Sequence, residues 1–294
     1  MRHSRSAQFA AAQADAAGIP VAARWNSVSS DPNDPLAVAV RARTLSLAFR
    51  PPVADRIAEL ERRCQGRSVL DIGAVAHDSL RMDSPTWLHG RLAAAAASCL
   101  AVDILPDGVE AMRARGFDAV VHDLSNGVGP LAARGPFEVI VAGEIIEHVP
   151  DQGMLFRTAQ ELLAEDGELV ITTPNPFAPK RTAAGRRGIV WENTDHILLA
   201  FPTGIAELAQ RHGLRLAEAF TVVDPTPSRQ PRKVAARALR TVRGRGWQPT
   251  GFATTGELHA VRVPTGRAVR APGRDWFVGE TFVYVVRRPT NAGG

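Results

Sequence analysis

The chain has 294 residues, of which 45% are hydrophobic and 22% are charged. This balance is ordinary for a globular protein that buries a full core, and it excludes the disordered and fibrous classes. The net charge is +5 at pH 7 and comes almost entirely from arginine, because the chain holds only two lysines. A basic surface of this kind is compatible with an acidic partner such as nucleic acid, a phosphorylated sugar or an anionic lipid.

The sequence carries neither a membrane segment nor a secretion signal. No run reaches the roughly 18 uninterrupted apolar residues that a membrane helix needs, and residues 1–17 lack the apolar core of a signal peptide. Cys64 and Cys99 stand far apart without C-x-x-C spacing, which favours buried thiols over a zinc knuckle or a disulfide framework. We therefore expect a cytoplasmic protein with no transmembrane segment.

The first residues are small, polar and turn-rich, and residues 1–35 are predicted to form a flexible N-terminal arm. Two helices are expected next, over residues 36–49 and 53–64, separated by a Pro-Pro pair. The expected organisation is an arm, a pair of helices and one large domain with two insertions: residues 1–35, 36–66 and 67–294, with insertions at 175–200 and 225–280.

From residue 68 onward, short apolar runs alternate with segments of helical periodicity. This pattern predicts an α/β fold with a doubly wound sheet and helices on both faces. The expected strands are residues 68–73, 99–103, 118–123, 137–143, 167–174, 214–224 and 281–288. The expected helices between them are residues 87–98, 108–115, 152–163 and 203–212.

Acidic residues end the first three predicted strands. Asp71 precedes Gly73, where a small residue lets the backbone approach a ligand at the carboxyl edge of the sheet. Asp103 ends the second strand and is suited to accept hydrogen bonds from both hydroxyls of a ribose. Asp123 ends the third, and it is followed by Leu124, whose backbone N–H could read an adenine edge. Exposed strand ends also favour Asp in general, but three in succession indicate a nucleoside ligand more specifically than one.

With these residues the chain resembles the class I S-adenosylmethionine-dependent methyltransferases over residues 66–224. The resemblance implies that Asp71 and Gly73 lie against the methionine moiety of the cofactor, that Asp103 holds the ribose and that Asp123 contacts the adenine. Leu124 and Gly143, which ends the fourth strand, complete the implied cofactor set. The closing run, residues 281–288, looks like the antiparallel seventh strand of these enzymes.

Two features depart from the usual pattern of this class. Val75 and His77 occupy the later glycine positions of G-x-G-x-G, so the loop cannot follow the usual backbone path without adjustment. The interval from Asp71 to Asp103 also exceeds the roughly 20 residues of a dinucleotide fingerprint, which makes a nicotinamide-dependent oxidoreductase the weaker reading. An extended helix after the first strand accounts for the interval.

The motif E-x-x-E-H follows the fourth strand as Glu144, Glu147 and His148. If Glu144 opens a helical turn, the other two residues share its face and could hold a divalent ion. The motif is similar to that of the quinone-biosynthesis catechol O-methyltransferases and the small-RNA 2′-O-methyltransferases. In the RNA enzymes a further histidine follows an aspartate, matched here by Asp195 and His196. The resemblance implies Mg²⁺ or another divalent metal on Glu144, Glu147, His148 and His196.

Such a cation would stabilise the alkoxide of an acceptor hydroxyl, and an unbound ligand could act as general base. The motif also occurs without metal, where the first Glu lies near the cofactor and the others cap or orient the helix. His148 and His196 are in either case the candidate catalytic residues, because an imidazole titrates near neutrality. The basic residues Lys180, Arg181, Arg186 and Arg187 are placed to border the acceptor pocket, either as anion-binding groups or as a solvated lid.

Three functions remain open at this point. The leading hypothesis is O-methylation of a hydroxyl on a small molecule, such as a sugar, a glycoconjugate or a specialised metabolite. The second is methylation of an RNA ribose 2′-hydroxyl, for which the arginine-rich segment 229–245 is a candidate binding element, although a solvated helix is the favoured interpretation of that segment. The third is a non-catalytic, cofactor-binding subunit. The expected partner is a small-molecule hydroxyl acceptor, with nucleic acid less favoured and a homodimer left open.

Overall fold

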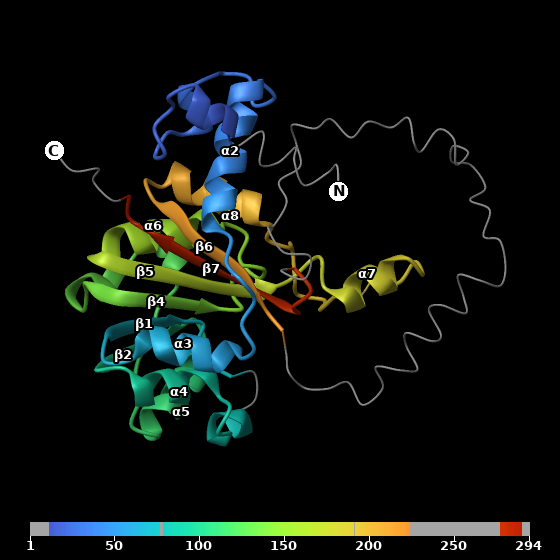
Figure 1. Ribbon diagram of the computed structural model, residues 1–294. Coiled ribbons are helices and arrows are strands. Elements are labelled where there is room, and N and C mark those ends of the chain that lie inside the picture. The colour runs from blue at the N-terminus through green and yellow to red at the C-terminus, as the bar shows by residue number, and fades with distance from the viewer. Residues whose placement is uncertain (1–11, 77–78, 191, 224–276, 290–294) are drawn as a thin grey trace.

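The computed structural model describes residues 12–76, 79–190, 192–223 and 277–289, and every structural statement below concerns these residues (Figure 1). Seven strands form one sheet in the order β3-β2-β1-β4-β5-β7-β6. β7 is antiparallel to β5 and β6, and the other neighbouring strands are parallel. The strands are β1 (Ser68–Ile72), β2 (Ser98–Asp103), β3 (Asp118–Val121), β4 (Phe137–Gly143), β5 (Leu163–Pro174), β6 (Arg215–Val222) and β7 (Thr281–Arg287).

The predicted fold class is confirmed: the sheet is mostly parallel, its last strand is antiparallel, and helices cover both faces (Figure 1). The helices are α2 (Pro35–Ala48), α3 (Arg56–Cys64), α4 (Leu88–Ala95), α5 (Pro106–Ala114), α6 (Gly153–Leu162), α7 (Pro179–Gly185) and α8 (Pro202–Arg211). Asp34 and Asp55 cap α2 and α3 by accepting hydrogen bonds from backbone N–H groups of the first turn. α7, which lies in the expected insertion 175–200, has no counterpart in the prediction.

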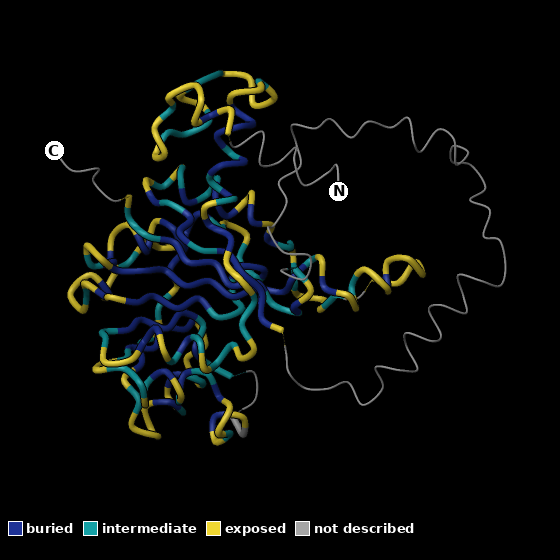
Figure 2. Tube along the Cα trace, viewed as in Figure 1, coloured by how far each residue is buried: buried dark blue, intermediate teal, exposed yellow. Residues whose placement is uncertain are grey.

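Alternate side chains of the central strands enter two separate cores. Leu70 and Ile72 face the core shared with α2, α6 and α8, whereas Val69 faces the core shared with α3 and α4. A strand that is buried on both faces needs a continuous apolar run, which is why these segments are visible in the sequence. Figure 2 shows the buried residues concentrated along the strands, and the exposed ones on the outer helices and on α7.

Part of the segment expected to be a flexible arm, residues 14–25, contacts the helices α2 and α8. Ala14 is buried against α2. The guanidinium of the buried Arg43 donates to Asp15 Oδ1 at 2.9 Å and to the carbonyl oxygens of residues 19 and 20. Trp25 Nε1 donates to Glu207 Oε2 on α8 at 2.8 Å. A buried arginine needs such acceptors. The polar, turn-rich sequence of the segment does not show that it supplies them to a distant helix.

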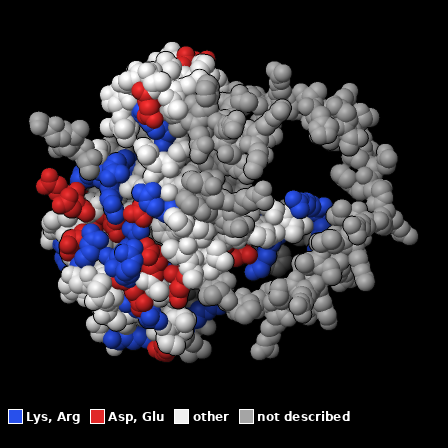
Figure 3. Space-filling model, in the orientation of Figure 1, with Lys and Arg blue, Asp and Glu red and all other residues white. Residues whose placement is uncertain are grey.

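A charged cluster lies between α3 and the strands β5, β6 and β7. Arg63 is 6% exposed and contacts Glu59, Glu168 and Glu218 at 2.7 to 3.2 Å. Arg287 contacts the same Glu168 and Glu218 from β7. Each buried charge is therefore paired with an opposite one, as burial requires. Figure 3 shows acidic and basic side chains interleaved on this side of the molecule, with no large field of one sign among the coloured residues.

Among the described residues, no helix combines the length and the apolar character that crossing a membrane would require.

Candidate active site

A cavity of about 1070 Å³ opens at the carboxyl ends of β1, β2 and β4. Most of the predicted site residues border it: Asp71, Gly73, Asp103, Gly143, Glu144, His148 and His196. Among the described residues, Asp123, Leu124 and Glu147 are not part of its lining. The edge of the sheet therefore brings together residues that lie more than a hundred positions apart in the chain.

The loop after β1 adopts a conformation that depends on glycine. Gly73 has φ +74°, and a Cβ there would lie 2.9 Å from Ile145 Cδ1. The loop is held by Asp103, whose carboxylate accepts hydrogen bonds from Val75 N at 2.9 Å and Leu105 N at 3.1 Å. Asp103 thus fixes the ends of β1 and β2 relative to each other in the cavity wall.

Val75 stands at one of the missing glycine positions, and Gly108 of α5 makes room for it. A Cβ on Gly108 would lie 2.3 Å from Val75 Cγ1. The close approach between loop and helix is preserved, but the small residue is on the helix instead of the loop. This explains how the loop departs from G-x-G-x-G without losing its packing.

The sequence analysis missed His89, which is the partner of Asp71. Both side chains are buried, and His89 Nδ1 lies 2.9 Å from Asp71 Oδ2. Trp87, beside it, donates from Nε1 to the carbonyl oxygen of Ala74 at 3.3 Å. The available signal was physical: an acid on a strand that is buried on both faces requires a donor, and the helix that follows carries one in WLHG.

The expected adenine contacts are not brought into the cavity. Asp123 is exposed and accepts a hydrogen bond from Ser125 N at 2.8 Å, which keeps the pKa of its carboxyl group below the usual value. Leu124 is buried in the core. The carboxylate of Asp123 therefore caps the short helical turn Leu124–Asn126.

Glu144 does not open a helix, and that expectation is corrected. Its φ is +47°, in the left-handed region, and residues 144–148 form a turn. The Glu144 carboxylate lies 3.7 Å from Arg56 Nη1 and accepts a hydrogen bond from Thr281 Oγ1 at 3.4 Å. Glu144 is not a member of the group of described side chains whose metal-binding atoms lie within 4.8 Å of one another.

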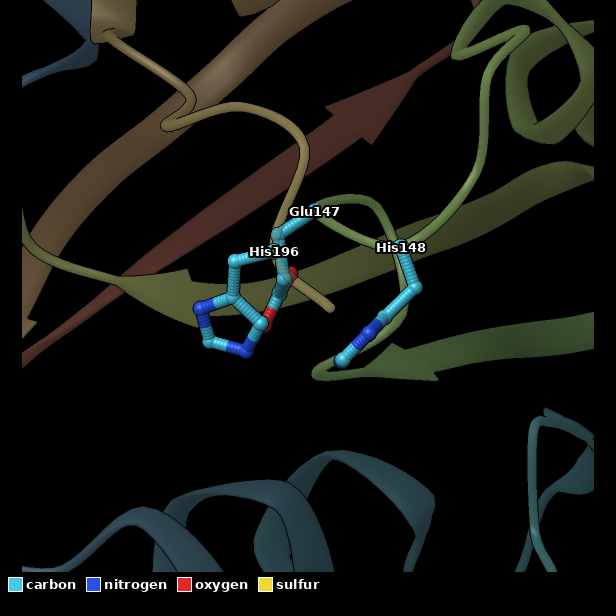
Figure 4. A group of neighbouring side chains, drawn as sticks. All are labelled: Glu147, His148 and His196. Atoms are coloured by element: carbon cyan, nitrogen blue, oxygen red, sulfur yellow. The ribbon is translucent and has the colours of Figure 1, made fainter. Parts of the chain in front are cut away.

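Glu147, His148 and His196 do converge (Figure 4). Each offers one metal-binding atom, and these three atoms lie within 4.8 Å of one another. The two imidazole rings are 4.7 Å apart between centroids and nearly perpendicular. Glu147 O accepts a hydrogen bond from Ile197 N at 2.9 Å, which ties the segment carrying His196 to the turn after β4.

The Glu147 carboxyl group is fully buried. Thr173 Oγ1 donates to its Oε2 at 3.0 Å, whereas Oε1 has no hydrogen-bond partner among the described residues. Burial raises the pKa of Glu147 to about 7, although the bond from Thr173 acts in the opposite direction. A buried carboxylate oxygen that has no hydrogen-bond donor is suited to bind a cation or a proton.

Each imidazole of the group is oriented by a carboxylate. His148 Nδ1 lies 3.1 Å from Asp195 Oδ2, and His196 Nδ1 lies 2.6 Å from Glu192 Oε1. Glu192 is held in turn by two bonds from Arg181, at 2.8 and 3.0 Å. A carboxylate on one ring nitrogen fixes the tautomer and leaves the other nitrogen available as a ligand or a base.

The basic residues expected around the acceptor divide into two groups. Lys180 and Arg181 line the cavity, whereas Arg186 and Arg187 do not appear in its described lining. Arg181 is engaged by Glu192, and Lys180 lies 3.7 Å from Glu280. Neither side chain therefore presents an unopposed positive charge. The arginine-rich segment 229–245 lies outside the described residues.

A seven-stranded sheet of this order, with an antiparallel β7 and a cavity at the carboxyl ends of its first strands, has the Rossmann-like fold of methyltransferases. The family described as a methyltransferase domain matches residues 46–219, more than half of the chain. The chain therefore belongs to this methyltransferase family.

Among curated proteins, the chain is similar to a ubiquinone biosynthesis O-methyltransferase from Caulobacter sp. (strain K31), with 44% identity over 41 residues. This match spans 14% of the chain and only 16% of that relative. Two solved methyltransferases dependent on S-adenosylmethionine, from Archaeoglobus fulgidus and Mesorhizobium loti, each align with 79% of the chain at a TM-score of 0.44. They are 14% and 16% identical to it over 92% and 95% of their own chains. These similarities do not identify the molecule that the chain methylates.

Proposed function

We propose that the protein methylates a hydroxyl of a small molecule, such as a sugar, a glycoconjugate or a specialised metabolite, with the help of a divalent metal. The observation that carries this proposal is a single cavity bordered by two groups of residues. Gly73 and Asp103 lie in its wall on the side of β1 and β2, and His148 and His196 lie in its wall after β4 and β5. A methyl donor and a hydroxyl acceptor could therefore meet inside it.

The residues at β1 and β2 fit the cofactor. Gly73 has no side chain, so its backbone borders the cavity directly, and Asp103 presents a carboxylate suited to a ribose diol. When bound, the cofactor supplies an electrophilic methyl group on a sulfonium. The role of Gly73, Asp103 and Gly143 in this proposal is to hold the cofactor so that the methyl group faces the acceptor.

The residues after β4 fit a divalent cation. The donor set consists of one oxygen and two nitrogens. The oxygen is Oε1 of Glu147, which has no hydrogen-bond partner among the described residues, and the nitrogens belong to His148 and His196. A cation held there would place positive charge next to the acceptor hydroxyl and favour its deprotonation. Glu144, bonded to Arg56 and Thr281, is left out of this set.

Proton removal is assigned to a histidine that the cation leaves uncoordinated, because one Nε2 lone pair cannot bind a cation and accept a proton at the same time. A neutral imidazole whose Nδ1–H donates to a carboxylate can accept a proton at Nε2, and the carboxylate then stabilises the imidazolium. His196 has this arrangement with Glu192, and His148 has Asp195 Oδ2 within 3.1 Å of its Nδ1. His148 is the stronger candidate, because Asn193 Nδ2 lies 3.3 Å from Nε2 of His196.

Metal binding is tested by titrating the chain with Mn²⁺ and following free Mn²⁺ by electron paramagnetic resonance. Glu147→Gln and His196→Asn are expected to weaken Mn²⁺ binding at least about tenfold. Glu144→Gln is the matched control: it changes a carboxylate of the same turn and should bind Mn²⁺ like the unmutated chain. Equal affinity in all four proteins, or a full methylation rate in the presence of a chelator, would remove the metal from the proposal.

A second candidate acceptor is an RNA ribose, favoured by the position of His196 beside Glu147 and His148. It predicts RNA binding that weakens steeply with salt, because released counterions drive such binding. Binding of an RNA oligonucleotide that is equal at low and moderate salt would count against it.

A further inference from the structure

His89, a residue that borders the cavity, has one buried polar atom without a partner in the described part of the chain. The residue is 1% exposed, and its Nε2 has no hydrogen bond among the described residues. The ring is fixed on several sides: Asp71 holds Nδ1, while Trp87 and Phe117 pack at centroid distances of 5.4 and 5.2 Å. Asp71 and His89 both border the cavity beside Gly73.

A buried and unpaired nitrogen costs free energy, and such a group is commonly retained where a ligand completes its bonding. An ionised carboxylate only accepts hydrogen bonds, so Asp71 places the proton of the ring on Nδ1. Nε2 then carries a lone pair, and the negative charge of Asp71 behind the ring favours a cation in front of it. The structure therefore offers an acceptor for a positively charged donor.

We infer that His89 is a cofactor-positioning residue whose Nε2 accepts a hydrogen bond from the α-ammonium group of the methionine moiety. The inference rests on the proposed placement of the cofactor against Gly73. Asp71, which the sequence placed next to the methionine, acts in this arrangement through the imidazole. The loop after β1 lacks the later glycines of G-x-G-x-G, and His89 of α4 would supply a binding group in place of that loop's backbone.

The test compares ligands that differ at the amino acid end. S-adenosylhomocysteine carries both the ammonium and the carboxylate, decarboxylated S-adenosylmethionine carries the ammonium alone, and 5′-methylthioadenosine carries neither. Calorimetry on the 294-residue chain measures the Kd of each. His89→Phe is expected to weaken the first two ligands about 10- to 100-fold and to leave 5′-methylthioadenosine within about twofold.

Three variants accompany His89→Phe. The double variant His89→Phe/Asp71→Asn avoids an unpaired buried charge and should show the same ligand pattern. His89→Gln, which keeps a polar group near the position of Nε2, should recover part of the affinity for the ammonium ligands. His212→Phe, at a half-buried histidine stacked on Phe156 away from the cavity, should change no Kd.

Weakening of S-adenosylhomocysteine alone would mean that Nε2 binds the carboxylate, and equal weakening of all three ligands would mean a merely structural role. Either result overturns the inference. If the Phe variants bind none of the ligands, nitrogen NMR of the unmutated chain decides. The Nε2 resonance of His89 should move with decarboxylated S-adenosylmethionine and stay in place with 5′-methylthioadenosine. A methylation assay that fails while these bindings hold refutes only the proposed acceptor.

Discussion

Gly108 of α5 packs closely against Val75 of the loop after β1. Alanine is normally about 1 kcal/mol better than glycine inside a helix, but a Cβ at Gly108 would lie 2.3 Å and 2.9 Å from the two methyl groups of Val75. A β-branched side chain has little freedom to move away. Overpacking should therefore outweigh helix propensity at this position.

We expect Gly108→Ala to lower the free energy of unfolding by about 1–3 kcal/mol, measured by urea denaturation. The double variant Val75→Gly/Gly108→Ala should recover stability relative to the single variant, because it restores the space on the loop side. Stability equal to or above that of the unmutated chain in Gly108→Ala alone would show that the loop moves without cost.

Cys64 gives a prediction based on pKa. Its side chain is fully buried, and burial raises the pKa of the thiol to about 12. The reactive thiolate is therefore scarce at pH 8. Iodoacetamide should leave Cys64 unmodified in the folded protein and alkylate it in urea, as read by mass spectrometry. Labelling of the folded protein at the rate of a free peptide thiol would contradict the burial.

Among the elements, α3 is joined to the sheet by the charges around Arg63. Removing one member of a buried ion cluster leaves its partners exposed to an apolar surrounding, which typically costs about 3–5 kcal/mol. Because Arg67 and Arg287 also approach Glu168, we expect Arg63→Met to fall near the lower end, about 3 kcal/mol, in urea denaturation. Arg62→Ala is the control: Arg62 bonds the same Glu59 from an exposed position and should cost less than about 1 kcal/mol. If Arg63→Met and Arg62→Ala lower the free energy of unfolding equally, the cluster stabilises the protein no more than a surface ion pair does.

The sequence predicted the strands well and the connections poorly. The central strands were visible because strands buried on both faces are continuous apolar runs between polar breaks. α7 was missed because it is short and lies in a segment rich in Pro, Arg and Gly. The turn at Glu144 was expected to be helical, since the spacing of Glu147 and His148 suits a helix and a turn alike. Only the backbone shows that Glu144 has positive φ.

The site was predictable where it depended on strand ends and unpredictable where it depended on contacts across the fold. Asp103 was expected from the end of β2, and the structure places it in the cavity wall. The pairing of Asp71 with His89 involves side chains that only packing brings together. Asp123 satisfied the sequence pattern, but its carboxylate caps a local turn.

At the scale of the whole molecule, the cofactor should stabilise the fold. A ligand that binds only the native state adds RT ln(1 + [L]/Kd), or about 2.7 kcal/mol at a hundredfold excess over Kd. S-adenosylhomocysteine should therefore raise the Tm of the chain in a thermal scan. Asp103→Asn should lose most of this shift at the same ligand concentration, because a ribose diol needs two acceptor oxygens. A full shift in Asp103→Asn would place the ribose elsewhere.

β7 is last in the chain but lies between β5 and β6 in the sheet. It pairs with seven residues of β5 and, across a bulge, with seven of β6. During synthesis, both neighbours leave the ribosome long before their shared partner, and their open edges can pair with other chains in the interval. Native assembly therefore waits for residues 281–287, and a ribosome stalled before them would expose an aggregation-prone nascent protein.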